Sequence, residues 1–152
     1  MVVSFPGKAT VSGTLVLDRG DVNLTFKRYL AEPVRLTLEN DYVTRIEGTG
    51  TDAEMMRAYL AAWGDREAYA VSHVGFGMNP NARYEALSMY DQRDFNGTEL
   101  RAMAGNFLFS TGANEFAGRH TAGHFDIPVM RTTIAVDDTI VVRDGVLQEV
   151  FG

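Results

Sequence analysis

The first third of the chain alternates hydrophobic and polar residues in the way typical of β-strands. From Pro33 to Glu39 every second residue is apolar, and a period of two places these side chains on one face of a half-buried strand. Asn40 and Asp41 then supply turn-forming residues, and Tyr42 to Glu47 returns as a second strand. Together with the aliphatic, β-branched segment from Thr14 to Asp18, the pattern predicts a strand followed by an antiparallel hairpin.

A helical spacing replaces this alternation after residue 50. Apolar residues recur three or four positions apart at Ala53, Met56, Leu60 and Trp63. Thr51 and Glu54 have the spacing of a capping box, and Gly64 offers a C-terminal stop. We therefore predict a helix that begins near Thr51, ends near Trp63 and packs its apolar side chains in the core.

The middle of the chain predicts one buried strand and one further helix. The apolar segment from Ala68 to Val74 leads into Gly75-Phe76-Gly77, where the glycines would let backbone and substrate approach closely. Asn79-Pro80 can open a second helix that continues through Met89, because proline is tolerated in a first helical turn.

The last third returns to short apolar segments separated by turns. These segments are Phe107 to Ser110, Thr132 to Val136 and Thr139 to Val142. The last two are joined through Asp137-Asp138, and Asp144-Gly145 marks another turn. A glycine-rich connection, Gly112 to Gly123, is long for a compact domain, and long connections are more often functional. The expected fold class is α+β, with mainly antiparallel strands and one or two helices.

Length and composition narrow the possible functions. The 152 residues predict a single domain, 1–152, and the absence of cysteine excludes disulfides, thiolate nucleophiles and Cys-based metal sites. A net charge of −6 does not favour binding to nucleic acid or to an anionic membrane. With no secretory signal pattern and no apolar run near the roughly 20 residues of a membrane helix, the expected location is cytoplasmic.

The segment Gly123-His124-Phe125-Asp126 carries the most informative candidate chemistry. On a strand, a spacing of two sends the side chains of His124 and Asp126 to the same face, where both could reach one metal ion. His73, at the end of its apolar strand, is the candidate third ligand, because two His and one carboxylate form the facial triad of non-haem Fe(II) enzymes. The alternative is a structural His–Asp hydrogen bond with His73 in the core. We interpret His120 as a loop residue, with a supporting contact to a ligand as the alternative.

Three segments of the sequence resemble a known enzyme family. Residues 72–77 (SHVGFG), 105–112 (GNFLFSTG) and 124–128 (HFDIP) are similar to the C-terminal part of 2,5-dihydroxypyridine 5,6-dioxygenases. These are Fe(II)-dependent enzymes that cleave a pyridine ring in nicotinate breakdown, and their fold is distantly related to that of aminopeptidase T and S metallopeptidases. The resemblance places the iron ligands on His73, His124 and Asp126, and a substrate-contacting hydroxyl on Ser110.

The same resemblance implies a reaction and a missing part. The substrates would be a hydroxypyridine and O₂, and cleavage of the C5–C6 bond would give N-formylmaleamic acid. Family members are longer, with an N-terminal half that supplies histidines for acid–base work. We therefore expect this chain to bind Fe(II) but to turn over substrate poorly by itself, and to depend on a missing N-terminal domain or on a homo-oligomer.

Two alternatives stay open from the sequence. One is an aminopeptidase T-like metallopeptidase domain, although the sequence departs from the ligands that its two-metal centre would need. The other is a noncatalytic α+β interaction module, in which His124 and Asp126 are structural and the connection from Gly112 to Gly123 contacts a partner.

Overall fold

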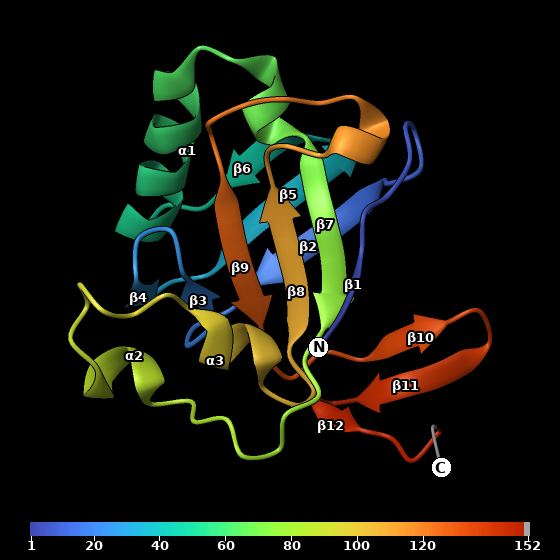
Figure 1. The fold of residues 1–152 in the computed structure, drawn as a ribbon. Coiled ribbons are helices and arrows are strands. Elements are labelled where there is room, and N and C mark those ends of the chain that lie inside the picture. The colour runs from blue at the N-terminus through green and yellow to red at the C-terminus, as the bar shows by residue number, and fades with distance from the viewer. Residues whose placement is uncertain (151–152) are drawn as a thin grey trace.

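The computed structural model describes residues 1–150, which form antiparallel sheets flanked by one longer and two short α-helices (Figure 1). The strands in these residues are β1 (Val2–Ser4), β2 (Gly13–Leu17), β3 (Val22–Asn23), β4 (Arg28–Tyr29), β5 (Val34–Glu39), β6 (Tyr42–Glu47), β7 (Val71–Phe76), β8 (Phe107–Thr111), β9 (Phe125–Val129), β10 (Ile134–Val136), β11 (Thr139–Arg143) and β12 (Val146–Leu147). The α-helices are α1 (Thr51–Trp63), α2 (Ala86–Met89) and α3 (Thr98–Ala102), and 3₁₀ turns lie at Arg66–Tyr69 and Glu115–Ala117. The expected α+β class with antiparallel strands is confirmed.

The sheet that positions the candidate site has the strand order β1-β7-β8-β9, and all its neighbours are antiparallel. In this sheet Ser110 of β8 pairs directly with Asp126 of β9. The register between β7 and β8 shifts between Val71 and Val74, so His73 lies within an irregularity of the sheet. Such bulges re-aim side chains and are common beside functional sites.

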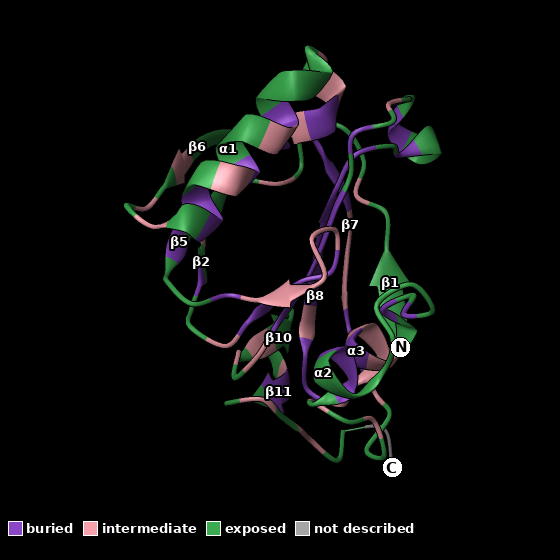
Figure 2. Ribbon diagram, turned by 90° about the vertical axis from the view of Figure 1, so that its left-hand side faces the viewer, coloured by how far each residue is buried: buried purple, intermediate pink, exposed green. Residues whose placement is uncertain are grey.

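A second sheet, β2-β5-β6, packs behind β7, β8 and β9, and α1 lies along one side of both (Figure 1). The main hydrophobic core lies between these elements and includes Leu36, Met56, Leu60, Phe125 and Ile127. In Figure 2 buried residues run along the inner side of α1 and through the central strands, while the outer side of α1 is exposed. The apolar spacing along α1 therefore places Ala53, Met56 and Leu60 in the core, as expected. Trp63, at the end of the helix, is 44% exposed, so its predicted burial is wrong.

The hairpin predicted from alternation is confirmed as β5 and β6, which pair antiparallel. Asn40 and Asp41 both adopt positive φ, at 48° and 79°. Two successive left-handed residues are the mark of the type I′ turn, whose twist suits a two-residue hairpin. Asn and Asp tolerate this conformation better than most residues, which is why the local sequence could predict the turn.

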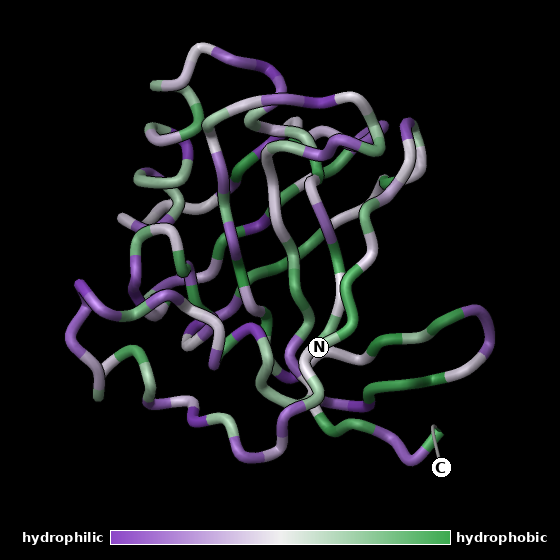
Figure 3. The backbone as a smooth tube through the Cα atoms, in the orientation of Figure 1, coloured by the Kyte–Doolittle hydropathy of each residue, from purple (hydrophilic) through white to green (hydrophobic). Residues whose placement is uncertain are grey.

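The C-terminal segments form a small separate sheet of β10, β11 and β12. It projects from the body of the molecule in Figure 1, and its strands are among the more hydrophobic parts of the chain in Figure 3. The turn between β11 and β12 is made by Asp144 and Gly145, both at positive φ. The two predicted strands and both predicted turns are therefore confirmed.

Several sequence predictions about the ends of elements are wrong. Gly50, not Thr51, caps α1, and no side chain makes a capping hydrogen bond, so the predicted capping box does not form. No helix opens at Asn79-Pro80, because the Asn79 side chain closes a turn onto the amide of Asn81; α2 begins only at Ala86.

The strand predicted over Ala68 to Val74 begins three residues later, at Val71. A 3₁₀ turn occupies Arg66–Tyr69, and Asp65 caps it by accepting a hydrogen bond from the amide of Glu67. The short helix α3 was not predicted, because five residues are too few for a helical period to be recognised. None of the helices in residues 1–150 is both long and apolar enough to cross a membrane.

Candidate metal centre

Three neighbouring strands bring the predicted site residues together. His73 lies on β7, Ser110 on β8 and Asp126 on β9, and His124 lies just before β9. The Nε2 atom of His73 is 3.7 Å from Oδ1 of Asp126, and Nδ1 of His124 is 3.5 Å from Oγ of Ser110. Residues separated by up to 53 positions in sequence thus form one cluster.

Asp126 is buried, and its two carboxylate oxygens differ in their partners. Oδ2 accepts a hydrogen bond from Nη1 of Arg101 at 2.9 Å, which is also a salt bridge. Oδ1 is buried without any hydrogen-bond partner. A buried carboxylate oxygen without a partner costs free energy, and such an atom beside an imidazole is a suitable metal donor.

His73 is held in the neutral form that a metal ligand requires. Burial is the main cause that lowers its pKa from the ordinary value of 6.5; the carboxylate of Asp126 opposes this shift, and the nearby charges of His124 and Arg101 add to it. The ring of Phe5 packs against the imidazole with centroids 5.6 Å apart. The neutral imidazole therefore has a free electron pair at working pH.

His124 is exposed, but its imidazole is oriented by the backbone. Its Nδ1 atom lies 2.8 Å from the carbonyl oxygen of Thr111. An imidazole nitrogen bonded to a carbonyl must carry the proton, which assigns the lone pair to Nε2. This arrangement, in which one ring nitrogen donates to a carbonyl, is the usual way proteins orient a metal-ligating histidine.

Ser110 is fully buried beside His124. Its hydroxyl lies 3.5 Å from both the Thr111 carbonyl oxygen and Nδ1 of His124, so both contacts are long. The hydroxyl therefore belongs to the same cluster, and its contact with substrate stays a prediction.

The types of donor atom in this cluster suit a divalent metal, although the three side chains do not converge on one point. Two imidazole nitrogens and one carboxylate oxygen suit iron or zinc, and Oδ1 of Asp126 is the orphaned atom among them. Within residues 1–150, however, no three His, Asp or Glu side chains are already close enough together to hold a metal ion. The structure presents a His73–Asp126 pair with His124 beside it.

Arg101 is the residue of this cluster that the sequence did not reveal. It lies on α3 and is separated by 25 residues from Asp126, to which it binds. No local pattern marks an arginine on a five-residue helix as a partner of a distant carboxylate. His120, by contrast, is exposed on the connection between β8 and β9, as expected for a loop residue.

Gly75 and Gly77, after His73, allow other backbone segments to approach closely, which is one of the two approaches predicted for them. A Cβ at Gly75 would lie 2.0 Å from the carbonyl oxygen of Val2, and one at Gly77 would lie 2.0 Å from that of Met103. The approaching groups are thus neighbouring backbone segments of this chain. The predicted approach of substrate to these glycines stays a prediction.

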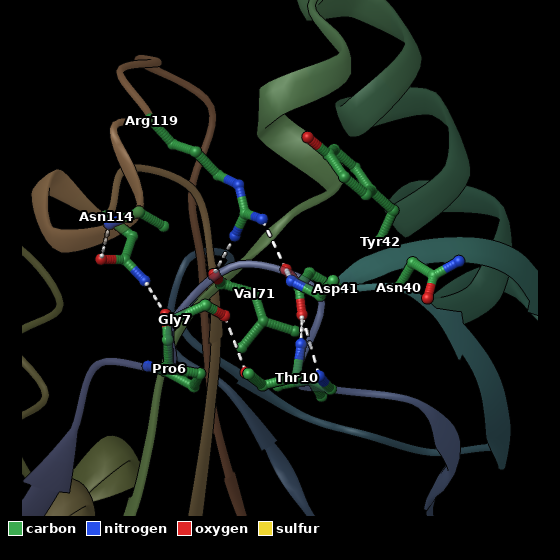
Figure 4. A network of polar contacts seen from close by, with 12 residues as sticks. Pro6, Gly7, Thr10, Asn40, Asp41, Tyr42, Val71, Asn114 and Arg119 are labelled. Carbon is green, nitrogen blue, oxygen red and sulfur yellow. Dashed lines mark hydrogen bonds and ion pairs between the residues drawn. The ribbon is translucent and has the colours of Figure 1, made fainter.

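The long connection from Gly112 to Gly123 is anchored to the body of the protein (Figure 4). Nη2 of Arg119 lies 2.6 Å from Oδ2 of Asp41, and both side chains are buried. Nδ2 of Asn114 donates to the carbonyl of Pro6 at 2.9 Å. An open cleft of about 380 Å³ lies beside this network, and none of the predicted metal ligands lines it. The connection that leads to His124 is therefore fixed at its middle.

Comparisons with known proteins agree with the family suggested by the sequence. The family model for 2,5-dihydroxypyridine 5,6-dioxygenase matches residues 1–149. The chain is 42% identical over 144 residues to a Pseudomonas putida protein named 2,5-dihydroxypyridine 5,6-dioxygenase, an alignment that covers 93% of this chain and 41% of the relative.

The fold agrees as well. The solved structure of 2,5-dihydroxypyridine dioxygenase from Pseudomonas putida superposes with a TM-score of 0.92 at 40% identity, covering 97% of this chain and 43% of that chain. The chain thus spans less than half the length of both relatives. From the match along residues 1–149 and the shared fold, it follows that the chain belongs to the 2,5-dihydroxypyridine 5,6-dioxygenase family.

Proposed function

We propose that this chain is the metal-binding part of an Fe(II)-dependent 2,5-dihydroxypyridine 5,6-dioxygenase. His73, His124 and Asp126 would hold the metal. One observation carries the proposal: the orphaned Oδ1 of Asp126 lies 3.7 Å from Nε2 of His73, in a chain that matches this family over residues 1–149. At 3.7 Å this contact is too long for a hydrogen bond. The alternative of a purely structural His–Asp contact therefore leaves that buried oxygen without a partner.

The chemistry of the donor set supports this assignment. Two imidazoles and one carboxylate are the donor set of non-haem Fe(II) sites that keep positions open for substrate and O₂. When bound, Fe(II) supplies the redox chemistry that dioxygenation of the ring requires. The reaction would cleave the C5–C6 bond of 2,5-dihydroxypyridine and place both oxygen atoms of O₂ in N-formylmaleamic acid.

The contribution of this chain is to keep each donor atom in the required state. Burial keeps His73 neutral, and the Thr111 carbonyl fixes the proton of His124 on Nδ1. Arg101 binds Oδ2 of Asp126, which leaves Oδ1 directed towards His73. In this proposal the hydroxyl of Ser110 contacts the substrate. Holding the substrate and O₂ side by side would remove the need for them to meet by chance in solution.

The proposal also covers residues that this chain does not supply, the binding partners and the location in the cell. Since the chain covers 41% of the relative, we propose that acid–base residues come from a further domain or from another subunit of a homo-oligomer. A hydroxypyridine and O₂ are the proposed partners, and the cytoplasm is the proposed location.

Metal analysis after anaerobic loading with Fe(II) tests the site. We expect His124→Ala and His73→Ala to lose most of the bound iron. His120→Ala, which removes an exposed imidazole four residues from His124, should retain it. Unchanged iron content in both the His73 and the His124 variants would overturn the proposed ligand set.

Two assays test the reaction. Oxygen uptake with 2,5-dihydroxypyridine by the Fe(II)-loaded chain, however slow, supports the dioxygenase if His124→Ala abolishes it. Release of an N-terminal amino acid from a peptide after loading with Co(II) or Zn(II), without oxygen uptake under Fe(II), would instead support the metallopeptidase.

A further inference from the structure

Helix α1 contacts three consecutive residues at the point where His124 enters the site. Gly123 packs so closely on the end of α1 that an added Cβ would lie 2.9 Å from the Trp63 ring, and it would lie 2.5 Å from Ala68 in the 3₁₀ turn that follows the helix. The ring of Tyr59 packs against that of Phe125 with centroids 4.8 Å apart. Between these two contacts, the hydroxyl of Tyr59 reaches the backbone of His124.

The Tyr59 hydroxyl binds both peptide groups of His124. It accepts a hydrogen bond from the His124 amide at 3.3 Å and donates one to the His124 carbonyl oxygen at 3.1 Å. The hydroxyl of Thr25 donates to the same carbonyl at 3.0 Å. Because β9 begins only at Phe125, these side chains hold His124 at the end of the strand.

The ring of Tyr59 is itself fixed by aromatic neighbours. Phe26 packs edge-on against it at 5.4 Å and Trp63 at 6.0 Å, in addition to Phe125. Edge-to-face and offset contacts of this kind have defined geometry. The hydroxyl therefore occupies a fixed position, and a phenylalanine at this place would keep the ring contacts while losing only the two hydrogen bonds.

We propose that Tyr59 is a positioning residue for His124, through which α1 sets the reach of this imidazole towards His73 and Asp126. This inference rests on the proposed function, because it assigns a role towards the metal. His124 is exposed and lies at the end of a long connection. The position of its imidazole therefore depends on how firmly its backbone is fixed. Residues that hydrogen-bond to a ligating side chain typically contribute 10- to 100-fold to metal affinity, and we expect a contact through the backbone to act at the lower end of that range.

A binding experiment with Tyr59→Phe tests the proposal. The probe is Co(II) alone, titrated anaerobically and followed through its visible absorption bands, with iron content after Fe(II) loading as a second readout. We expect the dissociation constant for Co(II) to rise by about 10-fold and the band shape to change. Thr25→Val, which removes one of the two hydroxyls on the carbonyl, should have a smaller effect in the same direction.

Tyr42→Phe is the matched control. It also removes one tyrosine hydroxyl, in this case one bonded to Glu67 at 3.0 Å, outside the cluster. We expect wild-type affinity for Co(II) from this variant. A third readout needs no metal: amide hydrogen exchange at His124 should accelerate in Tyr59→Phe and not in Tyr42→Phe, because only the former loses the acceptor of that amide.

The outcomes separate this inference from the function on which it rests. If His124→Ala loses Co(II) while Tyr59→Phe keeps wild-type affinity, band shape and amide exchange, the positioning role is overturned and the proposed site stands. If His124→Ala binds Co(II) as tightly as the wild type, both the site and the positioning role are overturned.

Discussion

Two buried aspartates show how the same side chain serves different purposes in this molecule. Every oxygen of Asp41 has partners: the amides of Ala9, Thr10 and Val11 donate to it, and Arg119 forms a salt bridge at 2.6 Å. Asp126 has one satisfied oxygen and one orphan. Complete satisfaction indicates a structural role, whereas the orphaned oxygen of Asp126 supports its proposed role as a ligand.

Removing Arg119 should destabilise the protein strongly. Arg119→Met leaves the buried Asp41 carboxylate without its cation, and breaking one side of a buried pair costs about 3 kcal/mol or more. Urea unfolding measures the loss. Arg93→Met is the control, because its pair with Asp91 is exposed on the surface and should contribute nothing measurable. Equal stability of the two variants would contradict the structural role of Arg119.

Asp41 should also make stability depend on pH. Burial acts to raise its pKa, but Arg119 and the three amides outweigh burial and hold the pKa below the ordinary value of 3.8. The carboxylate therefore adds stability that is fully present above about pH 4 and is lost as pH falls through the lowered pKa.

The test compares Asp41→Asn with the wild type in urea unfolding from pH 7 to pH 3. The free energy of unfolding should be lower in the variant at pH 7, and the difference should shrink below about pH 4. A difference that stays constant down to pH 3 would show that the ionised carboxylate contributes no such stability.

At the scale of elements, the edge strand β1 is held to β7 by close backbone contact at Gly75. Val3 pairs with Gly75, and Ser4 pairs with Val74 next to His73. Just beyond β1, Phe5 places its ring against His73. Phe5, just after β1, thus covers one side of the predicted metal ligand, and the absence of a side chain at position 75 permits β1 to pair with β7.

Gly75→Ala should therefore detach β1. Its Cβ would lie 2.0 Å from the Val2 carbonyl oxygen, a backbone atom that cannot move aside without breaking the pairing. We expect faster amide exchange at Val2 to Ser4 and a loss of about 1–3 kcal/mol, typical of overpacking. At Gly7 an added Cβ meets no atom within 4 Å, so Gly7→Ala is the control. Wild-type exchange in Gly75→Ala would contradict this account of the strand.

At the scale of the whole molecule, the chain carries the predicted metal donors but spans only 41% of its Pseudomonas putida relative. Loss of a general acid or base typically lowers a rate by 10²- to 10⁴-fold. We therefore expect the Fe(II)-loaded chain to consume oxygen with 2,5-dihydroxypyridine at least about 100-fold more slowly than that relative. Comparable turnover by the two proteins, measured with an oxygen electrode, would show that this chain holds every residue the reaction needs.

The sequence by itself determined the features that depend on neighbouring residues. The hairpin of β5 and β6, the helix α1 and the strands around Asp137 follow from periods of two and 3.6 and from turn residues, which act over a few positions. It also predicted the family, because three short segments lie in the family's order, and the comparison along residues 1–149 confirms this.

Only the tertiary structure decided which distant residues meet. The partners of Arg101, Arg119 and Tyr59 lie between 25 and 78 positions away and are set by strand register and helix packing. The end of a strand likewise depends on its neighbours, as for β7, which begins three residues later than the apolar pattern predicts. Local patterns fix backbone periodicity, but the contacts that fix a site arise only when separate elements pack against one another.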